Sequence, residues 1–386
     1  MTRTGPRATS ADTTSADTTS ADTTNADTTG AGTSTRHRAA RAPGRATVTR
    51  GLVTLAAAAL LAACGSTAST TPTPEPTTAP PTEAPTTVRI ASLKGPTTMG
   101  LVHLMSEADA GATTQDYEVT MYASPDEVVP KVAQGQVDVA LVPANLASVL
   151  YHRTAQDPDA AVQVLAANTL GMLEVLEAGD AVDDVADLAG RTIYSTGKGA
   201  SPELVLEHIL SENGIDPETD VTIEYRSEPT EVAGVLTTTP GAVGVLPQPF
   251  VTVLQAQHPE IRTAIDLNDA WNAVSPDSEI VTGVALVRSA FAQEHPQAVA
   301  DFLADYEAST TFTNEHPDQA APLVVAAGIV PSAAVAEAAI PRSHIVFVDG
   351  EELRTILGGY LDVLADGDPA AVGGSVPGDD FYYGAA

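Results

Sequence analysis

Short apolar runs rich in β-branched residues alternate with helical patterns from residue 88 to the end of the chain. Such runs, bounded by Gly, Pro, Asn or Asp, predict buried strands, and the longer stretches between them predict helices. The predicted strands are 88–93, 118–122, 137–142, 191–194, 221–225 and 242–246. The predicted helices are 96–110, 124–135, 230–238, 289–314, 317–328, 331–340 and 350–365, with another beginning at Ser201. This alternation indicates an α/β fold with mostly parallel sheets.

The pattern occurs in two blocks that share one local unit. Each unit is a glycine stop, a buried strand and a proline, at 135–143 in the first block and 241–247 in the second. About 300 residues follow position 87, which is enough for two lobes with separate cores. The sequence therefore predicts a two-lobed protein that ends in a series of helices.

A glycine-rich loop follows the first strand of each block and leads into a helix. The candidate ligand-binding residues in these two loops are Lys94, Gly95, Thr97, Thr98, Gly197, Lys198, Gly199 and Ser201. Ligands of open α/β sheets bind at this position, where helix N-termini offer unpaired N–H groups and glycines allow close approach. Neither loop has the glycine spacing of a P-loop or a dinucleotide-binding motif.

Lysine placement adds a charge argument. The chain has only three lysines; Lys94 and Lys198 lie in the two loops, and Lys131 lies in a predicted helix. One interpretation is that two cations face a single cleft that holds an anionic or zwitterionic ligand. The alternative is ordinary turn chemistry, with solvated lysines near the ends of strands.

Two amide side chains follow the later strands of the two blocks. Asn145 either reaches the cleft or caps a helix, and Gln248 either lines the cleft or belongs to a structural turn in 246–250. The eight histidines lack metal-ligand spacing, and no Gly-x-Ser-x-Gly elbow is present. We therefore predict no catalytic residue, no metal and no cofactor.

The charge of the chain excludes some partners. The net charge of −32 includes seven Arg and four Asp in residues 1–63, a contribution of +3, so the chain from Cys64 onward carries −35. Such a surface excludes nucleic-acid binding through a basic face and favours a soluble monomer.

Cys64 is the only cysteine, and it follows Arg50 and the apolar run 51–63. A charged residue, a short apolar stretch and small residues before a cleavage point are typical of an export signal. The segment resembles the lipobox of bacterial lipoproteins, which implies that Cys64 is acylated and becomes the mature N-terminus. We interpret 1–63 as leader and signal, with translation starting either at Met1, giving a long basic n-region, or at Val48.

The linker and the two blocks lead to a family. Residues 64–87 are rich in Thr and Pro and predict an extended spacer. Signal, lipobox, spacer and two α/β lobes resemble a solute-binding lipoprotein of an ABC importer. Segments 187–194 and 246–250 are similar to its nitrate/sulfonate/taurine and thiamine-precursor branch, although Gln248 stands where that branch often has Glu.

This resemblance implies a type II periplasmic-binding fold with a two-stranded hinge and a helical C-terminal return. Lobe I would be 88–171 with 279–386, and lobe II would be 172–278. The implied protein is an extracytoplasmic, lipid-anchored monomer, not an enzyme, that closes on a small anionic or zwitterionic solute. It would deliver that solute to an ABC permease and its ATPase.

Two alternatives belong to other classes. One is an enzyme on the same fold that acts on a small carboxylate, and the export signal argues against it. The other is a surface adhesin lipoprotein, and a cleft with two cationic loops argues against that.

Overall fold

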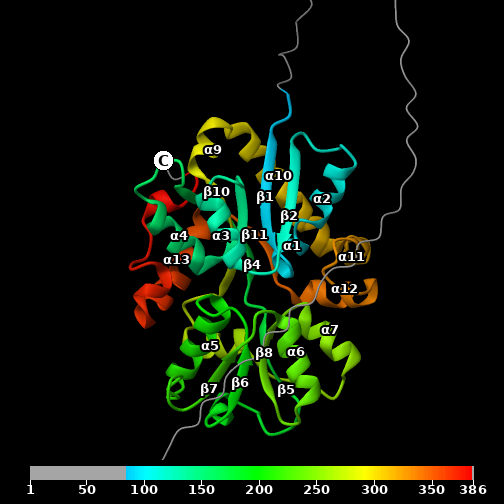
Figure 1. Ribbon diagram of the computed structural model, residues 1–386, viewed down its shortest axis with the longest axis vertical. Helices are drawn as coiled ribbons and strands as arrows, with labels where there is room; N and C mark the ends of the chain where they lie inside the picture. Colours follow the sequence, from blue (N-terminus) through cyan, green and yellow to red (C-terminus); the bar gives the residue numbers. More distant parts are fainter. Residues whose placement is uncertain (1–83, 385–386) are drawn as a thin grey trace, which may run out of the picture. The chain divides into compact units, whose positions relative to one another are not determined.

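Two β-sheets, each flanked by helices, make up the part of the chain that the computed structural model describes, residues 84–384 (Figure 1). The described residues all belong to one compact unit. The predictions made for residues 1–63, for Cys64 and for most of the linker lie outside these residues.

The first sheet has the strand order β11-β4-β10-β3-β1-β2. Its strands are β1 (Thr87–Leu93), β2 (Asp116–Tyr122), β3 (Val139–Pro143), β4 (Val162–Leu170), β10 (Val281–Arg288) and β11 (Ile345–Val348). Its N-terminal helices are α1 (Pro96–Met99), α2 (Val102–Asp109), α3 (Pro125–Ala133) and α4 (Ala144–Thr154). We call β1–β4 with everything from β10 onward the first lobe.

The second sheet has the order β7-β6-β8-β5-β9, and we call it and its helices the second lobe. Its strands are β5 (Leu173–Glu177), β6 (Thr192–Ser195), β7 (Thr222–Tyr225), β8 (Val243–Pro247) and β9 (Arg262–Asp266). Its helices are α5 (Ser201–Glu212), α6 (Pro229–Thr238), α7 (Phe250–Gln257) and α8 (Leu267–Val274), with a 3₁₀ turn at Val185–Leu188.

Strand direction corrects one prediction. The strands β1, β2 and β3 are parallel, as are β6, β7 and β8, and these are the six strands that the apolar runs predicted. However, β10 runs antiparallel to β3 and β4, and β5 runs antiparallel to β8 and β9. The expectation of mostly parallel sheets is therefore wrong. Each sheet is a parallel trio extended by antiparallel strands, which include those next to the crossings between the lobes.

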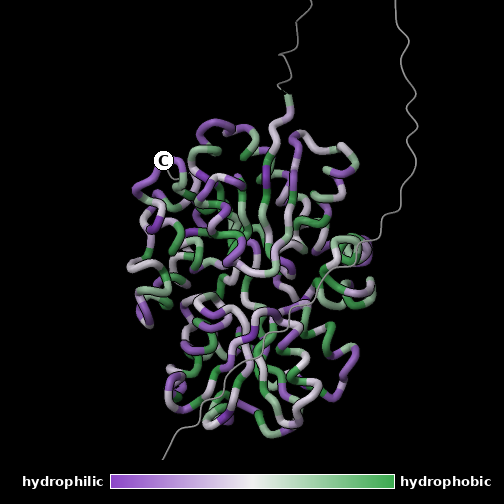
Figure 2. Tube along the Cα trace, viewed as in Figure 1, coloured by the Kyte–Doolittle hydropathy of each residue, from purple (hydrophilic) through white to green (hydrophobic). Residues whose placement is uncertain are grey.

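Side-chain alternation builds a core on both faces of each sheet. In β3, Val139 and Leu141 pack on one face, while Ala140 and Val142 pack on the other. Figure 2 shows hydrophobic and hydrophilic residues interspersed along the traces of both lobes. Full burial of a Val or Leu side chain stabilises a fold by roughly 1.5–3 kcal/mol, so these two-faced strands form the rigid base on which the loops lie.

The C-terminal helices complete the first lobe. They are α9 (Ser289–Glu294), α10 (Pro296–Glu315), α11 (Pro317–Ala326), α12 (Ala333–Ala339) and α13 (Gly350–Gly367), with 3₁₀ turns at Ile340–Arg342, Pro369–Val372 and Asp379–Phe381. The predicted helix 289–314 is divided because Pro296 lacks an N–H and starts a new helix instead. The predicted helix 96–110 is likewise divided, at Gly100 and Leu101.

The chain passes between the lobes twice. β4 ends at Leu170 and β5 begins at Leu173, while the return runs from the end of α8 to Val281 at the start of β10. Leu170 pairs with Val281, and the Thr282 hydroxyl donates to the Leu170 carbonyl at 2.7 Å. The two crossing segments are thus fastened to each other, although the residue boundaries predicted for the lobes stay predictions.

Candidate ligand-binding cleft

Two adjacent chambers lie between the lobes. The small chamber has a volume of about 180 Å³, and the large chamber has a volume of about 740 Å³. Both are lined by residues of the two lobes, and they share Ser124, Pro125, Gly197, Ala200 and Ser227. Because of this shared wall, we treat the chambers as two parts of one cleft.

The small chamber combines an apolar wall with hydroxyl groups. Its apolar residues include Leu93, Pro96, Val142, Pro143, Met172, Leu173, Pro202, Pro229, Pro247 and Phe250. Its hydroxyl side chains are Thr97, Ser124, Thr169, Thr196, Ser201, Ser227 and Thr282. Among the described residues that line it, Lys94 is the only charged one. In so acidic a chain, a chamber lined by a cation and by no carboxylate favours a negatively charged group.

The loop between β1 and α1 approaches the second lobe closely. Gly95 has a φ of 135°, a conformation that favours glycine, and a Cβ built there would lie 3.7 Å from Phe250 of the second lobe. Lys94 and Thr97 line the small chamber. Thr98 does not, because its side chain is buried and its hydroxyl donates to the Leu93 carbonyl at 2.6 Å. The predicted role of Thr98 as a ligand donor is therefore not supported by its position.

The loop between β6 and α5 turns twice through left-handed backbone. Gly197 and Gly199 have φ values of 71° and 75°, and the Gly199 N–H donates to the carboxylate of Glu203. Ser201, the first residue of α5, lines the small chamber, and its hydroxyl donates to the Thr282 carbonyl of the first lobe at 3.3 Å. These turns bring the N-terminus of α5 to the cleft.

Asn145 joins the lobes rather than capping its helix. It is fully buried at the start of α4, and its Nδ2 donates to the Gly199 carbonyl at 2.9 Å and to the Ala371 carbonyl at 3.2 Å. Gly199 belongs to the second lobe, so this amide connects the two lobes beside the large chamber. Its Oδ1 is buried without a hydrogen-bond partner among the described residues.

Gln248 lies behind the cleft and lines neither chamber. Its Nε2 donates to Glu174 at 2.8 Å, and its Oε1 accepts from the Thr252 hydroxyl at 2.7 Å. Arg342 of the first lobe pairs with the same Glu174 at 2.9 Å. Gln248 therefore belongs to a polar network between the lobes, and its position does not support the predicted contact with a ligand.

The two lysines line different chambers of the one cleft. Lys94 lines the small chamber, whereas Lys198 lines the large one, with its Nζ 5.5 Å from the ring centre of Tyr225. Glu203 and Glu207 line the large chamber as well. Burial, together with the neighbouring charges of Glu203, Glu218 and Asp368, raises the pKa of Glu207 to about 6.

Several residues of the cleft escaped sequence reasoning. The sequence predicts Phe250 only as the last residue of the turn 246–250 and predicts no ligand contact for Thr169, Thr282 or Tyr225, yet all four line a chamber. The proline-rich turn 246–250 was a usable signal for Phe250. No local pattern marks Thr169 or Thr282, because only the pairing of β4 with β10 brings these threonines together.

Comparison with solved structures identifies the fold. An ABC transporter structure from Parabacteroides distasonis is 18% identical, covers 77% of this chain and 98% of that one, and has a TM-score of 0.62. The periplasmic aliphatic sulphonate binding protein SsuA from Escherichia coli is 15% identical, with 74% and 88% covered and a TM-score of 0.58. The periplasmic nitrate-binding protein NrtA from Synechocystis PCC 6803 is 13% identical, with 70% and 74% covered and a TM-score of 0.53.

The chain therefore has the periplasmic-binding-protein fold, as the resemblance implied. A family model described as NMT1/THI5 like matches residues 114–320, more than half of the chain, so the chain belongs to that family. The similar structures named above are binding and transport proteins, in agreement with the prediction that this chain is not an enzyme. No curated protein sequence matches it. Within residues 84–384, no helix has the length and apolar character needed to cross a membrane.

Proposed function

We propose that this protein is the extracytoplasmic, lipid-anchored solute-binding component of an ABC importer. It captures a small anionic or zwitterionic solute, sulfonate- or nitrate-like, between its lobes and delivers it to a membrane permease with its ATPase. The observation that carries this proposal is the small chamber, where one lysine and several hydroxyl groups but no carboxylate line the space between the lobes. The family and the fold support the class, and the chamber supports the chemistry of the solute.

The chamber supplies two kinds of contact. For an oxyanion, the chamber offers hydrogen-bond donors and positive charge. They come from Lys94, from the hydroxyl side chains and from the N-terminus of α5. The prolines and Phe250 are an apolar surface for a short hydrocarbon body. The small chamber has about a quarter of the volume of the large one, 180 Å³ against 740 Å³, so it suits a compact part of the solute.

Closure follows from the position of the chamber between two lobes. A solute that contacts both lobes binds the closed form better than an open form, and this difference in affinity shifts the equilibrium toward closure. The closed protein is then the form that docks on the permease. It acts as a monomer, because each lobe supplies its own side of the cleft.

A thermal-shift screen with sulfonates, nitrate, carboxylates, amino acids and pyrimidines tests the binding function. We expect one class of anion or zwitterion to stabilise the protein by about 2.7 kcal/mol at a hundred times its dissociation constant. Small-angle scattering with that solute should show a modest contraction of a monomer. If no solute of these classes raises the melting temperature, or if only cations do, the proposal is wrong.

The lipid anchor has a separate test in Cys64→Ala. We expect the variant to leave the membrane fraction, because acyl chains on Cys64 would be the only firm attachment. Membrane pelleting followed by immunoblotting measures this, with Ser66→Ala as a control next to the same site. A variant that stays in the pellet as completely as the wild type would place the anchor elsewhere.

A further inference from the structure

The large chamber is an extension of the cleft that the proposed oxyanion contacts do not use. It has about 740 Å³ against 180 Å³ for the small chamber, and the two share a wall that includes Ser124, Gly197 and Ser227. The shared residues make the two chambers neighbours, so a solute anchored by its anionic group at Lys94 lies next to the large chamber. The residues that line the large chamber therefore indicate which chemical groups the rest of the solute carries.

The large chamber is lined by charged side chains of both signs, whereas the small chamber is lined by one cation. The carboxylates of the large chamber are Asp126, Glu203, Glu207 and Asp368, and its cations are Lys198, Arg153 and Arg226. Arg226 pairs with Glu224 at 3.0 Å and lies 5.0 Å from the ring centre of Tyr194, so its charge is already balanced. Within residues 84–384, none of the four carboxylates has a cation within ion-pair distance. The large chamber thus has an excess of negative charge.

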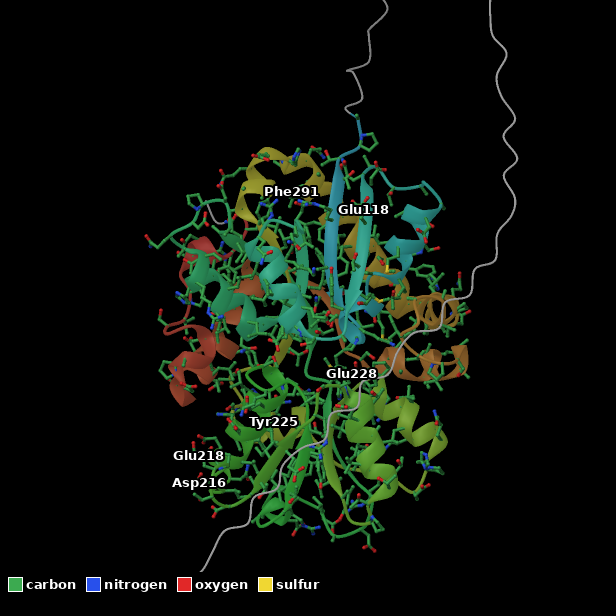
Figure 3. The ribbon with its side chains drawn as sticks, viewed as in Figure 1. Glu118, Asp216, Glu218, Tyr225, Glu228 and Phe291 are labelled. Atoms are coloured by element: carbon green, nitrogen blue, oxygen red, sulfur yellow. The ribbon has the colours of Figure 1, made fainter. Side chains whose placement is uncertain are left out.

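Tyr225 adds an aromatic face and a polar group to this wall. Figure 3 labels it in the second lobe, and its hydroxyl is buried without a hydrogen-bond partner among the described residues. Burial, followed by the neighbouring carboxylate of Glu203, raises the pKa of the Tyr225 phenol, which keeps it protonated. The ring already attracts the Lys198 ammonium at 5.5 Å, which shows that this face accepts a cation.

Glu207 is a carboxylate of the large chamber whose charged neighbours are mostly negative. It is half-buried on α5, and its neighbours Glu203, Glu218 and Asp368 are all negative, with Lys198 as the opposing charge. Its pKa of about 6 reflects this environment, because a carboxylate that is both buried and repelled holds its proton more tightly. An ammonium group placed here would add to the single positive charge that Lys198 supplies against three carboxylates.

We propose that the large chamber binds an amine on the solute, with Glu207, Glu203 and the Tyr225 ring as its recognition surface. The solute is then an extended zwitterion, with an oxyanion at Lys94 and an amine that reaches past Gly197 and Ser227. This inference rests on the proposed function, since it assigns the second end of the same solute. It selects a zwitterion over a simple oxyanion.

The test compares matched probes by calorimetric titration of the full chain. The probes are straight-chain alkanesulfonates of two to six carbons, each with and without a terminal amine. We expect the amine to strengthen binding of at least one chain length by about tenfold or more, the size of one charge-assisted contact. In Glu207→Gln, this ratio of affinities should fall by about tenfold.

Two further variants make the result independent of folding defects. Glu118→Gln removes one exposed carboxylate on β2, in the first lobe in Figure 3, and should leave the ratio unchanged. Lys198→Ala removes an exposed cation from the large chamber and should raise the ratio severalfold, the opposite direction to Glu207→Gln.

The outcomes separate the two proposals. If sulfonates bind but the amine gives no advantage at any length, or if Glu207→Gln and Lys198→Ala leave the ratio unchanged, the amine site is wrong and the proposed function stands. If no anionic probe binds with or without an amine, the proposed function fails and the amine site fails with it.

Discussion

Replacing Lys94 by alanine is expected to weaken binding of an anionic solute by roughly tenfold to a hundredfold. Lys94 is the only charged residue among the described residues that line the small chamber. A charge-assisted hydrogen bond in a partly desolvated site contributes roughly 1.5–3 kcal/mol, which corresponds to that range. The rest of the protein repels an anion, because the chain carries a net charge of −32, so no nearby cation would replace Lys94 in the small chamber.

The other two lysines serve as matched controls. Lys131 lies on α3 with its Nζ 5.3 Å from the ring centre of Tyr122, and it lines neither chamber. Lys198 lines only the large chamber, so Lys198→Ala should change the affinity for an amine-free sulfonate much less than Lys94→Ala does. Calorimetric titration of the three alanine variants with one sulfonate measures the order. Equal affinities in all three would mean that Lys94 does not hold the anion.

The parallel strands were predictable because their signals are local. The clearest cases are β3 and β8, where a short apolar run follows a glycine and ends at a proline, and both of these strands are buried on both faces. The sequence signal for β4 is weaker, because this strand carries the polar residues Asn168 and Thr169 near its C-terminal end. Those polar residues are buried beside β10, more than a hundred positions away, and no local pattern reports such a pairing.

Both candidate loops line the chambers, but the direction of their individual side chains was not predictable from the sequence. Lys94, Thr97, Gly197 and Ser201 line the small chamber, as residues at the carboxyl ends of strands would. The Thr98 side chain turns inward, where its hydroxyl donates to the Leu93 carbonyl at the end of β1. Whether Lys198 shares a chamber with Lys94 depends on how the two lobes meet, which is a property of the tertiary structure.

Gln248 is a single residue whose side-chain direction the sequence likewise does not predict. The resemblance placed it in a turn that lines the family's ligand site, and its sequence neighbours do reach the cleft, since Pro247 and Phe250 line the small chamber. Its own amide is held by Glu174 and Thr252, whose identity no turn motif encodes. A motif therefore locates a turn, while the partners of each side chain decide which of its residues face the ligand.

The second large effect is expected at Trp271, where Trp271→Ala should lower the free energy of unfolding by about 3–5 kcal/mol. Trp271 is fully buried on α8 of the second lobe, and its indole N–H donates to the Ser278 carbonyl at 3.2 Å. Its ring centre lies 4.6 Å from that of His208 on α5 and 5.6 Å from that of Tyr360 on α13 of the first lobe. Removing the indole would open a cavity at a contact between the lobes.

Urea unfolding followed by circular dichroism measures this loss, with Trp271→Phe as the matched variant. Phenylalanine keeps an aromatic ring against His208 and Tyr360 but cannot donate to Ser278, so its cost should be clearly smaller than that of alanine. A cost below about 1 kcal/mol for Trp271→Ala would mean that the site collapses around the missing ring. In that case the packing of α8 against α5 and α13, rather than the indole itself, would hold this part of the two lobes together.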